Sequence, residues 1–205
     1  MTDRNNIRTW SGVFFSPLDP RPENILPQDI AHALSLLCRA NGHFRCFYSV
    51  GQHCLACCDE ACARGLSREV RLACLLHDAS EAFISDITRP VKHNLPEYLV
   101  IEKRLQDTIY RRFGIDPEDA EVMRNVSAID DAMLYHEFLA LSGYPLYDSV
   151  PEIASQPVFG FRPFEETEKS FPKARSRQSS PRSRSRCWSS WRKTARLRCT
   201  RCATR

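Results

Sequence analysis

Helix start and stop signals recur along the first 141 residues and divide this part of the chain into helices joined by short loops. Prolines at helix starts, a capping box formed by Ser49 and Gln52, and glycines at helix ends mark the boundaries. Apolar residues at helical spacing predict helices from Pro27 to Gly42, Ser49 to Gly65, Ser67 to about Phe83, Pro96 to Gly114 and Asp116 to about Leu141. Strand-like alternation is confined to residues 12–16, so the sequence predicts an all-α fold.

The composition is that of one compact domain. The chain has 205 residues, of which 42% are hydrophobic and 26% are charged. It contains no run of about 18 apolar residues, so we expect no transmembrane helix and no membrane partner. The N-terminus lacks the apolar segment of a secretory signal. We therefore expect a cytoplasmic protein whose ten cysteines are reduced.

Charge is distributed unevenly along the chain. The net charge is +4, but residues 172–205 hold twelve of the 29 lysines and arginines and no acid, so residues 1–171 have 17 bases, 25 acids and a charge of −8. We predict a domain over 1–171 and a disordered basic tail over 172–205. The tail is interpreted as a nonspecific nucleic-acid arm, a solvated appendage without function, or a translation of a shifted reading frame. Its lone Cys199–Cys202 pair is a weak zinc motif.

The densest group of metal-binding side chains lies in residues 77–86. His77 and Asp78 are adjacent near the end of an apolar helix, and Glu81 and Asp86 follow. One imidazole and three carboxylates in this spacing could hold a divalent cation. The alternative is a surface helix with a solvated acidic face.

Further candidate ligands lie on other helices. His53 borders an apolar stripe, where it is either a ligand or a hydrogen-bonded core histidine. Asp130 and Asp131 interrupt an apolar stretch, and a carboxylate that borders a core needs a partner such as a metal ion. We expect the cysteines of one helix to be small core residues, because four thiolates on a straight helix cannot surround one ion: Cys54, Cys57, Cys58 and Cys62.

With these residues in this order, the chain resembles the HD superfamily of metal-dependent phosphohydrolases. The family pattern is a histidine, then a His-Asp pair, then a distant aspartate, and the resemblance covers residues 8–140. It is greatest to bacterial 5′-deoxynucleotidases and to phage dATP or dNTP triphosphohydrolases, which share the acids at Glu81 and Asp86. The resemblance implies an HD-domain helical bundle that binds a divalent metal (Mn, Co, Zn or Mg) through four ligands: His53, His77, Asp78 and Asp130.

The resemblance also implies roles for other residues. Glu81 and Asp86 would be catalytic, orienting a metal-bound water or transferring its proton. Phosphate-binding bases of the family match Arg39 and Lys92, each of which is alternatively a solvated surface cation. The family tryptophan that tests the sugar is replaced by Ala40, so sugar discrimination must come from elsewhere. Trp10 is a candidate for base stacking, or it packs on the core.

We therefore expect hydrolysis of a deoxynucleotide phosphoester, with a purine dNTP such as dATP as substrate. The alternatives are a 5′-deoxynucleotidase acting on dNMP, an enzyme that hydrolyses a signalling nucleotide such as ppGpp, and a nucleic-acid-binding protein that uses the basic tail. The expected partners are a small-molecule nucleotide and other copies of the chain in a homo-oligomer, in the cytoplasm of a bacterium or a phage-infected host.

Overall fold

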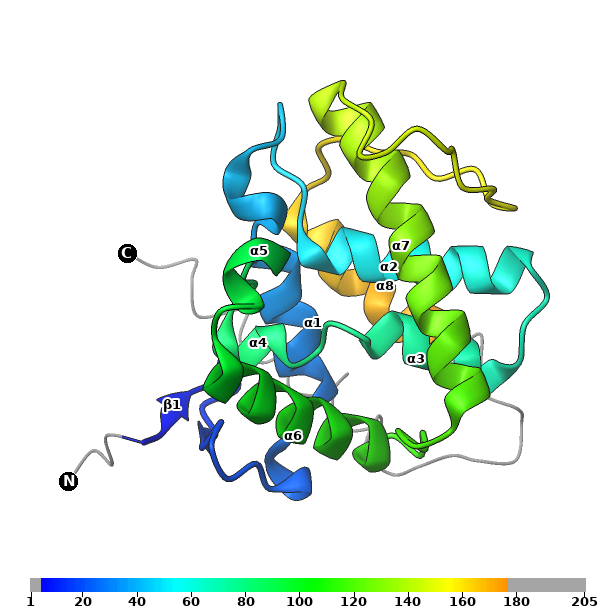
Figure 1. Cartoon of the computed structure of the whole chain (residues 1–205). Coiled ribbons are helices and arrows are strands. Elements are labelled where there is room, and N and C mark those ends of the chain that lie inside the picture. The colour runs from blue at the N-terminus through cyan, green and yellow to red at the C-terminus, as the bar shows by residue number, and fades with distance from the viewer. Residues whose placement is uncertain (1–4, 177–205) are drawn as a thin grey trace.

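The computed structural model describes residues 5–176, with side chains to Phe171. This part of the chain is predominantly helical, which confirms the predicted all-α class (Figure 1). The elements are the strands β1 (Ile7–Arg8) and β2 (Phe14–Phe15), the 3-10 helices η1 (Pro22–Asn24) and η2 (Arg39–Gly42), and the α-helices α1 (Pro27–Leu36), α2 (Val50–Ala63), α3 (Arg68–Leu76), α4 (Glu81–Ile84), α5 (Arg89–Lys92), α6 (Pro96–Arg112), α7 (Ala120–Ser142) and α8 (Phe164–Ser176).

The two strands form an antiparallel hairpin at the N-terminal end, in which β2 lies within the predicted strand-like run over residues 12–16 and β1 was not predicted. No helix within residues 5–176 is both long enough and apolar enough to cross a bilayer.

Helix caps account for the boundaries that the sequence predicted well. Ser49 accepts a hydrogen bond from the backbone N–H of Gln52, whose side chain bonds back, so the predicted capping box opens α2. The end of α6 is followed by Gly114 at φ 76°, as predicted. The start predicted at Asp116 is four residues early, because the Asp119 side chain accepts hydrogen bonds from the first turn of α7 and caps it.

The first predicted helix was too long. Instead of continuing to Gly42, α1 ends at Leu36, and the next two residues are extended and pair with the chain just before α2. The Arg39 N–H donates to the carbonyl of Tyr48, which fixes the Arg39 backbone beside the start of α2. Ala40 and Asn41 then adopt left-handed conformations, with φ of 55° and 50°. A β-like bridge and a left-handed turn therefore replace the predicted last turn.

The third predicted helix was also too long. It ends at Leu76 instead of Phe83, and a turn over residues 77–80 separates it from the short helix α4. His77 therefore caps the C-terminus of α3. Glu81 lies on a different helix from the one that His77 ends, whereas the sequence predicted a single helix that contained both residues.

The predicted domain boundary between Phe171 and Pro172 falls inside α8, which continues to Ser176. The prediction of a disordered tail from residue 172 is therefore wrong for its first five residues. The rest of that prediction, including the Cys199–Cys202 pair, lies outside the described residues. A deletion that tests the tail must begin after Ser176.

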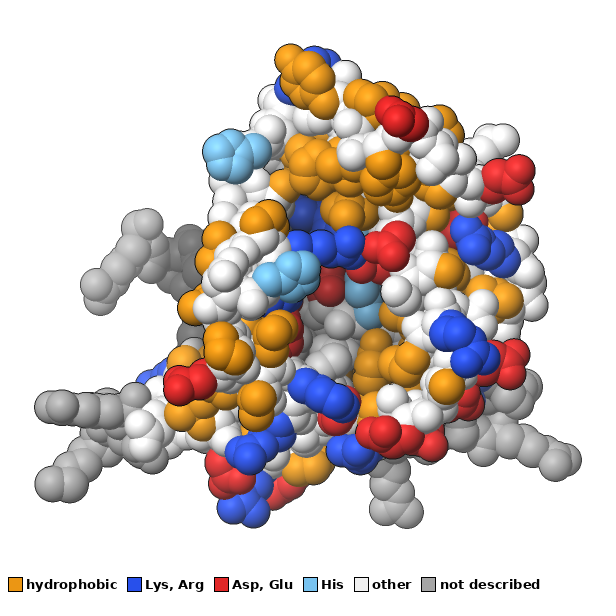
Figure 2. Space-filling model, in the orientation of Figure 1, with side chains coloured by type: hydrophobic (Ala, Val, Ile, Leu, Met, Phe, Trp, Pro, Cys, Tyr) orange, Lys and Arg blue, Asp and Glu red, His pale blue; other side chains and the backbone are white. Residues whose placement is uncertain are grey.

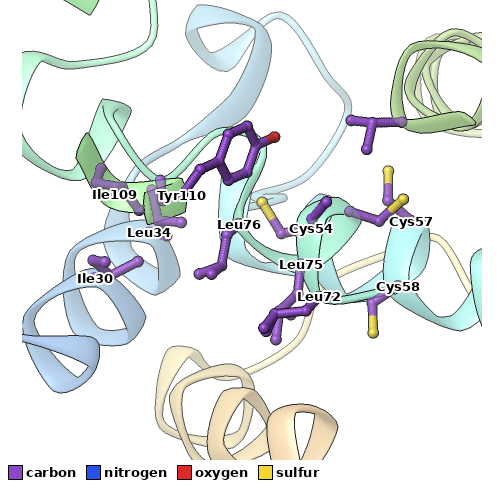
Figure 3. Close-up of a cluster of buried hydrophobic side chains, with 14 of the residues drawn as sticks. Ile30, Leu34, Cys54, Cys57, Cys58, Leu72, Leu75, Leu76, Ile109 and Tyr110 are labelled. Carbon is purple, nitrogen blue, oxygen red and sulfur yellow. The ribbon is translucent and has the colours of Figure 1, made fainter. Parts of the chain in front are cut away.

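The core lies around α2, which contacts α1, α3, α7 and α8. Figure 3 shows apolar side chains of α1, α3 and α6 next to three cysteine side chains of α2. Cys54, Cys57 and Cys58 are buried, as predicted for small core residues. Cys62 is exposed, contrary to the prediction, because it lies in the last turn of α2, where its sulfur faces Arg71 at 3.7 Å.

Candidate metal centre

Four side chains from three segments of the chain converge on one point, and we call them the donor cluster: His53 of α2, His77 and Asp78 after α3, and Asp130 of α7. The two Nε2 atoms lie 3.0 Å apart. Oδ1 of Asp130 lies 3.1 Å from Nε2 of His53. Oδ2 of Asp78 lies 3.3 Å from Nε2 of His77. The four predicted metal ligands are therefore neighbours in space.

The other nitrogen of each imidazole is already engaged. Nδ1 of His77 lies 2.8 Å from the carbonyl of Cys74, and Nδ1 of His53 lies 2.7 Å from a carboxylate oxygen of Glu137. A carbonyl and a carboxylate only accept, so each Nδ1 carries a proton, and each ring presents an Nε2 lone pair in its neutral form, which is the form that binds a metal. Two lone pairs and two carboxylate oxygens thus face one another.

This donor set fits a divalent cation. Donors at about 2.1 Å from a six-coordinate ion lie about 3.0 Å apart when they are adjacent. The separations within the donor cluster, from 3.0 to 3.7 Å, are of this size. Imidazole nitrogens with carboxylate oxygens suit transition metals and zinc. The Sγ of Cys57 lies 3.6 Å from Nε2 of His53, which adds a soft atom at the edge of the cluster.

Electrostatics in the donor cluster also favour a cation. Burial opposes a charged ring, but Asp78 and Asp130 outweigh it and raise the pKa of His77 well above its usual value. Burial and Arg39 likewise disfavour the charged form of His53, while Glu137 and Asp130 raise its pKa. Partial burial opposes the ionisation of Asp130, yet the two histidines hold its pKa well below the usual range. The same acidic field that favours these protons would favour a metal ion in their place.

A glutamine from α6 fixes the turn that carries two of the donors. The side-chain amide of Gln106 donates to the carbonyl of Leu76 at 2.7 Å, and its oxygen accepts from the backbone N–H of Ser80 at 3.0 Å. These bonds span the turn and satisfy backbone groups left open where α3 ends. The orientation of His77 and Asp78 thus depends on a residue some thirty positions away in sequence.

Glu137 is the main site residue that the sequence analysis missed. It is fully buried, and its carboxylate accepts from His53 at 2.7 Å, from Nε of Arg39 at 2.9 Å and from the Tyr48 hydroxyl at 3.2 Å. Burial opposes its ionisation, but His53 and Arg39 lower its pKa. A signal existed: Glu137 lies seven residues after Asp130, on the same face of an otherwise apolar stretch.

The two predicted catalytic acids lie beside the donor cluster. Glu81 is buried, and its Oε2 has no hydrogen-bond partner among the described residues. Burial, together with Asp78 and Asp86, raises the pKa of Glu81 well above its usual value. Burial and Asp78 also raise the pKa of Asp86 against the opposing charge of Arg39, although its carboxylate accepts a hydrogen bond from the Ala40 backbone. Glu81 therefore has a free oxygen and a tendency to hold a proton.

The predicted phosphate-binding bases are both paired with acids. Arg39 is bound to Glu137 and lies 3.4 Å from Asp78. The Lys92 ammonium lies 2.6 Å from Glu102 and 3.8 Å from Glu81. Neither is the freely solvated surface cation that the alternative interpretation expected.

A cleft opens towards the donor cluster. Figure 2 shows a hollow between α5 and α7, with acidic, basic and histidine side chains around and inside it. The Asp78 and Asp130 side chains remain 20% and 22% exposed, so the cluster is reachable from solvent. At the cleft mouth, Arg89 pairs with Asp130 and Asp131, each at 2.9 Å.

Trp10 is not part of this group. Its ring stacks on His32 of α1 at a centroid distance of 4.6 Å, and His32 contacts the ring of Phe164 edge-on. The contacts of Trp10 seen in residues 5–171 include none with the donor cluster. The structure thus places it where the hairpin, α1 and α8 meet, on the surface and outside the buried core.

No protein-family model matches the chain. The chain is 36% identical over 111 residues to the uncharacterized protein YfdR of Escherichia coli (strain K12), a match that covers 54% of this chain and 60% of YfdR. It is 35% identical over 144 residues to the uncharacterized protein RCAP_rcc00048 of Rhodobacter capsulatus, and this match covers 67% of this chain and 73% of that protein. The chain therefore belongs to the same protein family as RCAP_rcc00048.

Proposed function

We propose that this protein is a metal-dependent phosphohydrolase of the HD type that hydrolyses a deoxynucleoside triphosphate. The observation that supports it is the donor cluster at the cleft. There, the Nε2 atoms of two imidazoles lie beside two carboxylate oxygens, and the Nδ1 atom of each ring is held by another acceptor. The order of these residues in the sequence is that of the HD pattern. The preference for a purine base rests on the sequence resemblance.

In this proposal, His53, His77, Asp78 and Asp130 hold a divalent ion within an HD-type helical bundle. Such an ion, when bound, lowers the pKa of a coordinated water and offsets the charge that builds on phosphorus. The chain's own acids handle the proton. The raised pKa and the unpartnered Oε2 of Glu81 suit a group that takes up and returns a proton during turnover.

Arg39 and Glu137 act by positioning in this scheme. Arg39 spans three acids of the cleft, and Glu137 orients both Arg39 and the imidazole of His53. Asp86, held by the Ala40 N–H, is a second group that orients water. That the basic tail is disordered and that it contacts nucleic acid stay predictions, and the residues used in this proposal all lie within residues 39–137.

A substrate and metal panel tests the proposal. The full-length protein is assayed with dNTPs, NTPs, dNMPs and ppGpp in the presence of Mn²⁺, Co²⁺, Mg²⁺ or Zn²⁺, and the products are identified by mass. We expect dNTP hydrolysis with release of triphosphate. Release of phosphate from dNMP alone would instead make the protein a 5′-deoxynucleotidase, and inactivity of the metal-loaded protein on every nucleotide would contradict the proposal.

A matched pair of variants ties the activity to the donor cluster. His77→Ala removes one donor, so we expect loss of both bound metal and hydrolysis. His43→Ala removes an exposed histidine of the turn after η2 and should change neither. A folded His77→Ala variant that keeps stoichiometric metal and normal turnover would show that the site is assigned to the wrong residues.

A further inference from the structure

The phosphates of the proposed substrate need a cation that can leave its protein partners, and the two predicted bases are poorly placed for this. The Arg39 side chain is only 10% exposed, and its Nε is bound to the fully buried Glu137. Lys92 is 19% exposed and makes a 2.6 Å contact with Glu102. Displacing Arg39 would leave a buried carboxylate unpaired, which is costly.

Arg89 is placed differently. It is the first residue of α5, its side chain is 54% exposed, and its two terminal nitrogens contact two neighbouring acids of α7. One nitrogen meets Oδ2 of Asp130, whose Oδ1 faces His53, so the guanidinium lies on the solvent side of a donor-cluster carboxylate. The other nitrogen meets Asp131, whose side chain is 53% exposed.

Arg89 makes two ion pairs, and the pair with Asp131 is the weaker one. Ion pairs between exposed side chains contribute little to stability, because water and salt screen them. A phosphate oxygen offers the planar guanidinium a charged acceptor of suitable geometry. A phosphate entering the cleft can therefore replace Asp131 as a partner of Arg89 without exposing a buried charge.

The position of the Arg89 guanidinium favours a nucleotide that has more than one phosphate. A phosphoryl group beside the donor cluster would be separated from Arg89 by the width of the Asp130 carboxylate. The next phosphate of a polyphosphate chain would extend outward along the cleft, towards Arg89. A monophosphate has no such group.

We propose that Arg89 exchanges Asp131 for the outer phosphates of a bound nucleotide and so makes the site prefer di- and triphosphates to monophosphates. This inference rests on the proposed function. It assigns the discrimination between dNTP and dNMP to one residue at the cleft mouth, and it assigns Asp131 the role of a competitor for that residue.

The test uses Arg89→Gln, Asp131→Asn and the double variant, with Arg111→Gln on the exposed face of α6 as the control. For each metal-loaded protein, KM and kcat are measured with dNTP and with dNMP. Binding of inorganic tripolyphosphate and of orthophosphate is measured by calorimetry. Arg89→Gln should weaken dNTP and tripolyphosphate binding about ten- to a hundredfold, the size of one charged hydrogen bond, and leave dNMP and orthophosphate nearly unchanged.

Asp131→Asn should tighten tripolyphosphate binding by a few fold, and this gain should vanish in the double variant. Equal losses for mono- and triphosphates, or an Asp131→Asn gain that persists without Arg89, would overturn the inference. Loss of metal from Arg89→Gln would show that it acts through Asp130, and would also overturn it. If the wild-type protein neither binds nor hydrolyses any nucleotide, the proposed function itself fails.

Discussion

The floor and the mouth of the cleft are built by different means. The floor consists of the donor cluster and Glu137, carried mainly by the long helices α2 and α7, and its two histidines have Nδ1 fixed by a carbonyl or a buried carboxylate. The mouth consists of Arg89 and Asp131, of which Arg89 begins a helix of only four residues. Both of its side chains are about half exposed and paired with each other.

The difference indicates which part of the site can adjust. Moving a floor residue would unpair buried polar groups, which costs far more than breaking an exposed ion pair. The floor is therefore set by folding, whereas the mouth can rearrange around a ligand. Mutations in the floor should act on metal retention, and mutations in the mouth should act on substrate choice.

The sharpest contrast lies between two adjacent acids, Asp130 and Asp131. Asp130→Asn removes a floor carboxylate, so we expect metal affinity to fall by more than about a hundredfold, beyond the loss typical of outer positions, with no measurable hydrolysis. Asp131→Asn should keep stoichiometric metal and change turnover less than about tenfold. Metal analysis after gel filtration checks both, and the reverse pattern would exchange their roles.

The next effect concerns Glu81, which borders the floor without belonging to the donor cluster. Glu81→Ala should keep metal and nucleotide binding but lose about 10²- to 10⁴-fold in turnover, the usual size of a general acid–base contribution. Calorimetry and metal analysis of the purified variant check this. A variant without metal would make Glu81 a ligand or a structural residue, and a loss below about tenfold would assign the proton to Asp86 or to solvent.

The next prediction concerns Glu60, near the C-terminal end of α2, which connects that helix to the segment over residues 151–156. Glu60 is buried, but hydrogen bonds from Ser155, Ala154 and Arg64 outweigh burial and lower its pKa to about 2, from 4.5. A lowered pKa stabilises the fold above pH 4.5, and this contribution, about 3 kcal/mol, disappears as the pH falls towards 2.

Glu60→Gln should therefore flatten the loss of unfolding free energy between pH 5 and pH 2. Urea titrations across this range measure it, with Glu152→Gln at an exposed position as the control. If Glu60→Gln and the wild-type protein lose stability in parallel, the carboxylate does not hold the segment over residues 151–156 as the structure indicates.

The smallest expected loss concerns Glu137, which lies behind the donor cluster and supports His53. Glu137→Gln keeps the shape of the side chain but removes the charge that orients His53 and balances Arg39. We expect metal affinity to fall about ten- to a hundredfold, as for other groups that support a ligand from behind. Isothermal titration with Zn²⁺ or Co²⁺ measures it, and an unchanged affinity would mean that the neutral amide orients His53 equally well.

Local signals in the sequence predicted much of the fold. Caps such as Ser49 and Gln52 act over one turn, so they were readable, as was the order of the four donors. What escaped prediction depends on contacts between distant residues. The end of α3 is fixed by Gln106 of α6, and the end of α1 by pairing with residues 48–50. The sequence analysis missed Arg89, because the sequence does not show that the fold places this exposed arginine beside Asp130 and Asp131.

The turn at Ala40 and Asn41 lowers the stability of the fold but helps to arrange the side chains of the site. Alanine in the left-handed region costs about 1 kcal/mol or more, which glycine would avoid. In return, the Ala40 N–H meets Asp86, and the preceding Arg39 reaches Glu137. Selection for heat resistance alone would favour Ala40→Gly, yet the freer backbone would loosen the arginine that balances the acids. Ala40 should therefore be kept when the protein is engineered for higher thermal stability.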